Sequence, residues 1–426
     1  MIRYHGAWVL PITRPAIRDG TVVEHDGRIV YVGERSSAPP GEDRDLGDAV
    51  LLPGLVNAHT HLELTTFRGM LEGLQFVDWI RRLQRLKQST MTPERYLEAA
   101  RLGITEGLRA GITTYADCCD SGVSMRTMLE LGVRGIMYQE VFCPSTDPAL
   151  VDANIAALDE KLRALRPLET ELVHLGISPH APYTVSDPLF ERLAHADLPL
   201  AIHIAESEDE TQLVTRAEGR FADGLRARDI PVAPRGRSPV AMLARLGVLD
   251  ARPLLIHCVR TDDEDIGEIA RTDCPVAHCP VSNAKLGHGV APLLAMLTAG
   301  IRVGVGSDSM ASNVRMNLLE EGCVAALMQC AHTGRADALS AEQALELATL
   351  GGARALGLDT RIGSLEPGKD ADLAAFALPS HHTRPSYDPA AALVFSSAGR
   401  HPATFVAVRG AVRVWKGQVR AVSSEL

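Results

Sequence analysis

No apolar run in the sequence reaches the roughly 18 residues that a membrane-spanning helix requires. The N-terminal segment MIRYHGAWVLPITRPAIRDG also lacks the continuous apolar stretch of a secretory signal peptide. We therefore expect a cytoplasmic protein that does not have a membrane as a partner.

Basic segments and paired cysteines are missing as well. Lysine and arginine total 43 against 53 aspartates and glutamates, a net charge of −10, and no block of basic residues stands out. This argues against nucleic acid as a partner. The 8 cysteines include no CxxC pair and are too few for a disulfide framework in 426 residues. A zinc site built from thiolates is therefore not expected.

The middle of the chain alternates short apolar runs with segments typical of helices, and apolar residues make up 46% of the whole. One helical segment, TPERYLEAARLGITEGLRA, has a proline near its start and Gly111 after its end. Strand runs that alternate with helical crossovers predict an α/β fold of the (β/α)₈ TIM-barrel type. The runs are LLPGLVNAH, GITTYADC, RGIMYQEVF, ELVHLGISPH, LPLAIHIAE, PLLIHCV, CPVAHCP and IRVGVGSDS.

Both ends of the chain consist of short β-rich runs and turns. TVVEHDGRIVYVGER places Asp26-Gly27 between two such runs, which is typical of a hairpin, and PATFVAVRGAVRVWKGQVRAV alternates around Gly410 and Gly417. We expect residues 1–52 and 361–426 to pair into one small composite β-sandwich. Residues 53–360 would form the barrel.

Two histidines one residue apart, His59 and His61, lie in the apolar run AVLLPGLVNAHTHLEL. Side chains at positions i and i+2 of a strand lie on one face. The pair is therefore either a coincidence in the core or half of a metal site.

Other polar residues lie at the ends of later runs. His203 and, three residues on, Glu206 lie at the end of the fifth run, His257 at the end of the sixth, and Asp308 at the end of the eighth. In a barrel of this type the C-terminal ends of the strands meet at one rim, where the chemistry takes place. The topology would therefore bring these side chains together.

Each of these residues has an ordinary explanation when taken alone. A single histidine at a strand end is more often a core residue, GSDS can be a turn or a helix cap, and the run ESEDE around Glu206 is typical of a solvated helix start. Taken together, they supply a complete set of nitrogen and oxygen ligands for a divalent metal. The joint pattern therefore favours a metal site.

Five segments, PGLVNAHTH, HIAESEDE, IHC, HCPVSNAKLGHGVAP and GVGSDSMASN, resemble the amidohydrolase superfamily. The resemblance covers nearly the whole chain, and its motifs are specific in combination. It is greatest to the branch of aromatic-heterocycle deaminases, which includes triazine hydrolases and methylthioadenosine/S-adenosylhomocysteine deaminases. GISPHAPYTVS with HTHLEL is also similar to aminodeoxyfutalosine deaminases.

The resemblance implies a role for each strand-end residue. Binuclear members carry a carboxylated lysine on strand four, where ELVHLGISPHAPY has no lysine, so one divalent ion is expected, with zinc as the first choice and iron or another metal as alternatives. Glu206 would be the proton shuttle, and His257 would orient the water. The implied metal ligands are His59, His61, His203 and Asp308, and the implied catalytic residues are Glu206, His257 and Asp308.

These roles suit hydrolytic deamination. A divalent metal lowers the pKa of its water to about 7, so that hydroxide can attack the amino-bearing ring carbon while Glu206 protonates the ring nitrogen and ammonia leaves. We expect an adenine nucleoside with a modified ribose end, such as aminodeoxyfutalosine, methylthioadenosine or S-adenosylhomocysteine. Guanine, pterins and triazines are alternatives on the same scaffold. A non-catalytic binding relative is disfavoured because the ligand set is complete.

Contacts to a small heterocyclic substrate are expected at three positions. His180 in SPHAPY ends the fourth run, Glu63 would share the face of His61, and Trp79 with Phe76 could form a wall beside a purine. The alternatives are a loop-locking histidine, a salt-bridged rim residue and core aromatics. The sequence leaves homo-oligomer formation open.

Several further residues have less specific interpretations. Arg134 precedes its strand and is interpreted as structural. The loop SNAKLGHG, with Asn283, is expected to shape the pocket, and His288 is an extra histidine near the seventh strand. Ser309 flanks Asp308 and could orient it.

Overall fold

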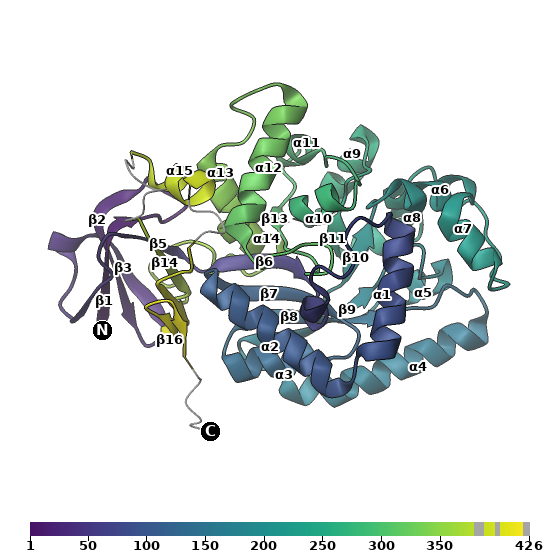
Figure 1. The fold of residues 1–426 in the computed structure, drawn as a ribbon, viewed down its shortest axis with the longest axis horizontal. Helices are drawn as coiled ribbons and strands as arrows, with labels where there is room; N and C mark the ends of the chain where they lie inside the picture. The colour runs from purple at the N-terminus through teal and green to yellow at the C-terminus, as the bar shows by residue number, and fades with distance from the viewer. Residues whose placement is uncertain (379–386, 397–400, 421–426) are drawn as a thin grey trace.

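A computed structural model describes residues 1–378, 387–396 and 401–420. Within them, two sheets of four parallel strands each form a barrel (Figure 1). Parallel bridges between Ile177 and Leu200 and between Thr60 and Asp308 join the two sheets at both edges. The first sheet holds β6 (Leu55–Thr60), β7 (Ile112–Cys119), β8 (Arg134–Val141) and β9 (Val173–Pro179), and the second holds β10 (Ala201–Ile204), β11 (Leu254–His257), β12 (Val276–His278) and β13 (Val303–Val305).

These strands form where the sequence has its apolar runs. Every residue of β6, β7 and β8 is buried, as expected for parallel strands that are covered on both faces. The closure between β13 and β6 depends on Gly306, because a Cβ there would lie 2.8 Å from the backbone of His59. The predicted barrel is confirmed.

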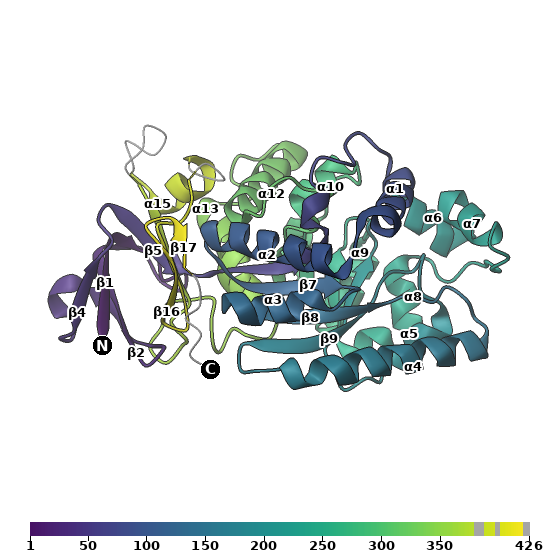
Figure 2. The same ribbon diagram turned by 60° about the horizontal axis from the view of Figure 1, so that its bottom comes forward.

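Helices cover the outside of the barrel, and Figure 2 shows α2, α3 and α4 along one side. The predicted segment TPERYLEAARLGITEGLRA forms α2, with Thr92 as its N-cap and Gly111 at φ +85° after its end. No helix in the described part of the chain is long and apolar enough to cross a membrane. The longer helices are α1 (Phe76–Thr90), α2 (Pro93–Arg109), α3 (Val123–Leu131), α4 (Pro148–Leu165), α6 (Glu208–Arg216), α7 (Gly219–Arg226), α9 (Asp263–Thr272) and α12 (Leu318–Thr333), and the shorter ones are α5 (Asp187–Leu193), α8 (Pro239–Arg245), α10 (Pro280–Lys285), α11 (Leu293–Thr298), α13 (Ala341–Glu346), α14 (Gly352–Ala355) and α15 (Pro389–Ala391).

Strands from both ends of the chain form one further sheet beside the barrel (Figure 1). Its two halves join where β5 pairs antiparallel with β14. The Asp26-Gly27 turn has positive φ at both residues, as the predicted hairpin requires. The nine strands in the described residues are β1 (Ile2–Val9), β2 (Ile17–His25), β3 (Arg28–Glu34), β4 (Glu42–Asp45), β5 (Ala49–Pro53), β14 (Leu373–Ala377), β15 (Phe405–Val408), β16 (Ala411–Trp415) and β17 (Gln418–Val419).

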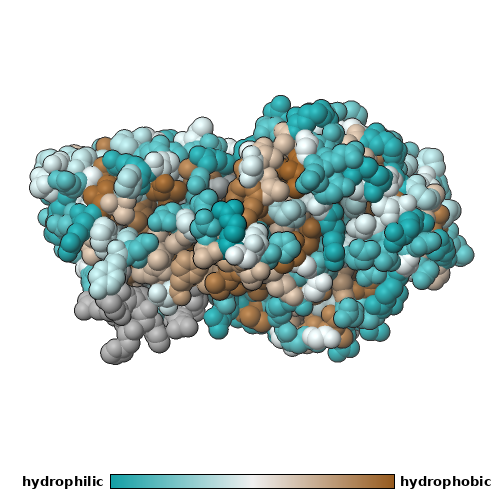
Figure 3. Space-filling model, turned by 90° about the horizontal axis from the view of Figure 1, so that it is seen from above, coloured by the Kyte–Doolittle hydropathy of each residue, from teal (hydrophilic) through white to brown (hydrophobic). Residues whose placement is uncertain are grey.

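This terminal sheet curls over its own core. The rings of Tyr4 in β1 and Phe405 in β15 lie 4.8 Å apart, although β5 and β14 stand between their strands. In a flat sheet three strand spacings would separate them by roughly 14 Å. The predicted composite β-sandwich is therefore confirmed. In Figure 3, apolar residues gather along the middle of the molecule, towards the boundary between this sheet and the barrel.

A buried ion cluster ties the barrel to the C-terminal strands. Arg134 begins β8 and is 1% exposed. Its guanidinium lies 2.8 Å from Asp370 Oδ2 and 3.1 Å from Asp372 Oδ2, just before β14. The interpretation of Arg134 as a structural residue is confirmed, because its guanidinium forms ion pairs with two buried carboxylates.

Replacing Arg134 should strongly destabilise the protein. Arg134→Met keeps the length of the side chain but leaves two buried carboxylates short of a partner, which typically costs about 3–5 kcal/mol. Arg101→Met is the control, because the Arg101–Glu130 pair is about half exposed and such pairs contribute about 1 kcal/mol or less. Urea denaturation measures both variants. Equal losses of unfolding free energy would contradict the role of the buried cluster.

Candidate active site

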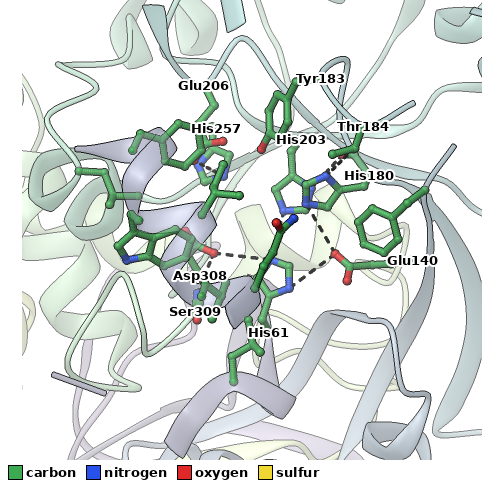
Figure 4. Close-up of a pocket in the computed structure, with 18 of the residues that line it drawn as sticks. His61, Glu140, His180, Tyr183, Thr184, His203, Glu206, His257, Asp308 and Ser309 are labelled. Carbon is green, nitrogen blue, oxygen red and sulfur yellow. Dashed lines mark hydrogen bonds and ion pairs between the residues drawn. The ribbon is translucent and has the colours of Figure 1, made fainter. Parts of the chain in front are cut away.

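Four strand-end residues converge at one rim of the barrel, and Figure 4 shows three of them, His61, His203 and Asp308. His59 lies in β6, His61 follows it, His203 lies in β10, and Asp308 follows β13. His59 Nε2 and His61 Nε2 lie 3.3 and 3.7 Å from Asp308 Oδ1. His61 Nε2 also lies 3.2 Å from His203 Nε2. The structure thus brings together all four residues that the sequence placed at a metal site.

The hydrogen bonds of these rings fix which nitrogen faces the cluster. His61 Nδ1 donates to the carbonyl of Cys118 at 3.0 Å, and His203 Nδ1 donates to the carbonyl of His180 at 3.1 Å. A carbonyl only accepts, so each Nε2 is left with a lone pair that points inward. His59 Nε2 is buried and makes no hydrogen bond within the described residues. This donor set fits a divalent metal.

The surroundings of these four groups keep them in the protonation states that a metal needs. Burial lowers the pKa of His61 to about 4 and also lowers the pKa of His59 and His203. Burial alone would raise the pKa of Asp308, but the neighbouring histidines outweigh it and hold that pKa well below its usual range. At neutral pH the cluster therefore has three neutral rings and one carboxylate.

Asp308 is held in place by its own segment and by α10. Its backbone has φ +54°, a strained conformation for a residue other than glycine. The amide of Ser309 donates to Oδ1 at 2.7 Å. The hydroxyls of Ser282 and Ser312 donate to Oδ2 at 2.5 and 3.1 Å. The carboxylate orientation is thus set before any ligand binds, and Ser309 contributes to it as expected.

Glu206 lies on the wall of the cavity beside two histidines. Its Oε1 is 3.5 Å from His257 Nε2 and 3.3 Å from His288 Nε2. His257 Nδ1 in turn lies 3.0 Å from Asn283 Oδ1. Burial would raise the pKa of Glu206, but His257 and His288 outweigh it and lower that pKa. A carboxylate beside the cluster of His59, His61, His203 and Asp308 can exchange protons with a bound molecule.

A cavity of about 150 Å³ opens over these residues. His180 and Trp79, both expected near the substrate, line it, together with Phe76 and Tyr183. Trp79 Nε1 donates to the carbonyl of Ala311 at 3.3 Å, which fixes the indole. Flat aromatic walls with a few polar groups are typical of a site for a small heterocycle.

Glu63 is not brought to this cavity, which corrects the expectation that it shares the face of His61. After Thr60 the chain leaves the strand and forms the 3₁₀ helix Leu62–Phe67. Glu63 is 1% exposed, accepts a hydrogen bond from the amide of Ser121 at 3.0 Å, and lies 3.4 Å from Lys87 Nζ. Its position fits the alternative of a salt-bridged residue.

Glu140 was missed by the sequence reasoning, although it lies at the end of β8 and lines the cavity. Its Oε1 is 3.8 Å from His61 Nδ1 and 4.0 Å from His180 Nε2, and makes no hydrogen bond among the described residues. Burial raises the pKa of Glu140 well above its ordinary value. The signal was a charged residue inside the run RGIMYQEVF. Lys87 of α1 also lines the cavity.

A (β/α)₈ barrel with this cluster at its rim has the architecture of a metal-dependent hydrolase. Residues 50–418 match the amidohydrolase family, and the chain belongs to that family. It is a hydrolase that acts on carbon–nitrogen bonds other than peptide bonds.

Individual relatives are similar over nearly the whole chain. The sequence is 34% identical to a 5-methylthioadenosine/S-adenosylhomocysteine deaminase of Moorella thermoacetica, over 98% of this chain and 95% of the relative. The structure of an adenosine deaminase from Xanthomonas campestris with bound zinc is similar with a TM-score of 0.87 and 30% identity, over 99% of this chain and 95% of that one. An atrazine chlorohydrolase from Arthrobacter aurescens TC1 complexed with zinc has a TM-score of 0.84 and 26% identity, over 100% and 97%.

The stability of the metal-free protein should depend on pH through His180. Burial lowers the pKa of His180 from 6.5 to about 3. Between these values the unfolded chain binds a proton that the folded protein does not, so this contribution to stability is lost as the pH falls below 6.5. His180→Gln should remove it, which would flatten the pH dependence by on the order of 1 kcal/mol per pH unit. Urea denaturation of both proteins at about pH 7.5 and about pH 5.5 measures the difference. Parallel losses would contradict the assignment.

Proposed function

We propose that the protein is a metal-dependent hydrolytic deaminase of an aminated aromatic N-heterocycle. The expected substrate is an adenine nucleoside with a modified ribose end. The observation that carries this proposal is the carboxylate of Glu206 on the cavity wall, three residues after His203 and beside the cluster of histidines. Ring deamination requires such a proton carrier, and amide hydrolysis needs it less. The similarity to nucleoside deaminases supports the assignment.

One divalent ion, with zinc as the first choice, would be held by the four clustered residues. Three neutral imidazoles and one carboxylate form a donor set that suits zinc, and the buried Nε2 of His59 makes no hydrogen bond within the described residues. The segment at the end of β9 has no lysine that could bridge a second ion. When bound, such an ion lowers the pKa of water to about 7 and so supplies the nucleophile. The proposed ligands are His59, His61, His203 and Asp308.

The proton transfers are assigned to Asp308 and Glu206. Asp308 can take the proton of the attacking water, and His257, whose Nδ1 side is held by Asn283, can orient that water. Glu206 takes up one proton of the attacking water and donates it to the ring nitrogen next to the amino-bearing carbon. It then takes up the second water proton, the one that Asp308 receives, and passes it to the amino group so that ammonia can leave. An ionised carboxylate on the wall of the cavity suits this role, because it can act first as a base and then as an acid.

The cavity walls would hold the substrate by shape and by a few polar contacts. Phe76, Trp79 and Tyr183 can pack against a flat base. His180 Nδ1 lies 2.9 Å from Thr184 Oγ1, so its Nε2 is the atom available to a ring nitrogen. We propose that Glu140 and Lys87 replace Glu63 as polar groups for the part of the substrate beyond the base, since both line the cavity.

A second candidate function is hydrolysis of a triazine. The structural similarity to the atrazine chlorohydrolase favours it, and the chemistry of Glu206 would serve a triazine ring equally well. The polar groups at Glu140 and Lys87 favour the nucleoside, because a compact triazine offers them less to bind.

Glu206→Gln should separate catalysis from metal binding. The amide keeps the shape but cannot cycle a proton, so kcat should fall about 10²–10⁴-fold. His61→Ala should instead lose both metal and activity, because it removes a ligand. Metal analysis should give about one divalent ion per chain in the wild type and in Glu206→Gln. Near-full activity of Glu206→Gln, or loss of its metal, would contradict the shuttle, and two required ions would contradict the single-metal site.

Substrate preference should follow the polar end of the cavity. Methylthioadenosine, S-adenosylhomocysteine and aminodeoxyfutalosine should be deaminated with a kcat/KM at least roughly 10-fold above that of free adenine, because each extra hydrogen bond contributes about 1 kcal/mol or more. Ammonia release and the loss of adenine absorbance measure this. Guanine, pterins and triazines are the comparison set. Faster turnover of any of them than of every nucleoside would show that the substrate assignment is wrong.

A further inference from the structure

His288 lies behind Glu206, outside the wall of the cavity. It is 3% exposed, and its Nε2 lies 3.3 Å from Glu206 Oε1. His257 Nε2 approaches the same oxygen at 3.5 Å. Two ring nitrogens thus converge on one oxygen of the carboxylate. The other oxygen, Oε2, is the one left for a bound molecule.

The position of His288 is built into its loop. The glycines on both sides, Gly287 and Gly289, have φ of +72° and +107°, conformations that favour glycine. The amide of His288 donates to the backbone carbonyl of Asn283 at 2.9 Å. Its ring and that of Phe76 pack edge to face, with centroids 4.6 Å apart. The sequence Gly-His-Gly therefore aims one imidazole at Glu206 and holds it there.

Asn283 of α10 holds both histidines at once. Its side-chain oxygen lies 3.0 Å from His257 Nδ1, and its backbone carbonyl accepts from the amide of His288. One residue thus supports the ring of His257 and the backbone of His288. This shared support keeps Nε2 of both histidines beside Glu206 Oε1, while Oε2 stays available to a bound molecule.

We propose that His288 is a positioning residue that anchors Glu206 Oε1 and leaves Oε2 as the oxygen that exchanges protons with the substrate. This rests on the proposed function, in which Glu206 is the proton carrier. The last torsion of a glutamate side chain is broad and allows the carboxylate to rotate. A proton carrier must present one oxygen first to the ring nitrogen and then to the leaving amino group. Fixing the opposite oxygen from outside the cavity restricts this motion without occupying the substrate's space.

Two amide variants test this proposal. The amide nitrogen of His288→Gln can reach the Nε2 position and keep a polar N–H group beside Oε1, whereas His288→Asn is shorter and cannot. We expect kcat of the Gln variant to stay within about threefold of the wild type. The Asn variant should lose about 10–100-fold in kcat, with little change in KM, because displacement of a catalytic group by about 1 Å can cost this much. Metal content and the denaturation midpoint should match in both variants.

Combining His288→Asn with Glu206→Gln identifies the route of the effect. If His288 acts through Glu206, the double variant should be no slower than Glu206→Gln alone, and the two losses will not multiply. Full multiplication, wild-type kcat in His288→Asn, or equal losses in the Asn and Gln variants would overturn the proposal. The single variant Glu206→Gln tests the proposed function separately. If it retains activity, the shuttle assignment fails; if it loses activity while His288→Asn does not, only the role of His288 fails.

Discussion

The backbone hydrogen bond from Asp308 N to His59 O, at 3.0 Å, joins the end of the last barrel strand to the first strand. The same contact brings the Asp308 carboxylate to the histidines of the proposed metal site. Asp308 lies within reach of His59 only because β13 runs beside β6 when the ring of strands closes. Gly306 permits that approach, since a side chain there would strike the backbone of His59. Closure of the fold and assembly of the site are therefore one event.

The cost of burying so many ionisable groups explains much of the remaining architecture. Histidines in this position stay neutral because burial disfavours their charged form, so they present lone pairs instead of positive charge. Asp308 and Glu206 remain ionised because hydrogen bonds and imidazoles surround them. Carbonyl oxygens of Cys118 and His180 then decide which nitrogen of His61 and His203 faces inward. The site is thus orientated by the second layer of contacts as much as by the residues that touch a ligand.

Helices that follow the strands supply both the walls of the cavity and the supports of the strand-end residues. α1 supplies Phe76 and Trp79 as walls and Lys87 as the cation beside Glu63, while α10 supplies Asn283 and Ser282 behind His257 and Asp308. Walls and supports thus come from different elements. Variation of α1 could alter what is bound, and α10 would still hold the groups that act on it.

The barrel, the strand-end residues of the site and the N-terminal hairpin could be predicted from the sequence. The spacing of the apolar runs and the positions of the polar residues at their ends carry that information. Apolar runs separated by helical segments determine the barrel, and polar residues at the ends of those runs, such as His203 and Asp308, meet at one rim by topology alone. Asp26-Gly27 likewise determines a hairpin through its backbone preference. Only the tertiary structure decided that the Glu63 side chain lies away from the cavity, since its direction depends on where β6 ends and the 3₁₀ helix begins. The contacts of Glu140 with His61 and His180, and of His288 with Glu206, were also decided there, because they join residues far apart in the sequence whose distances no local pattern encodes.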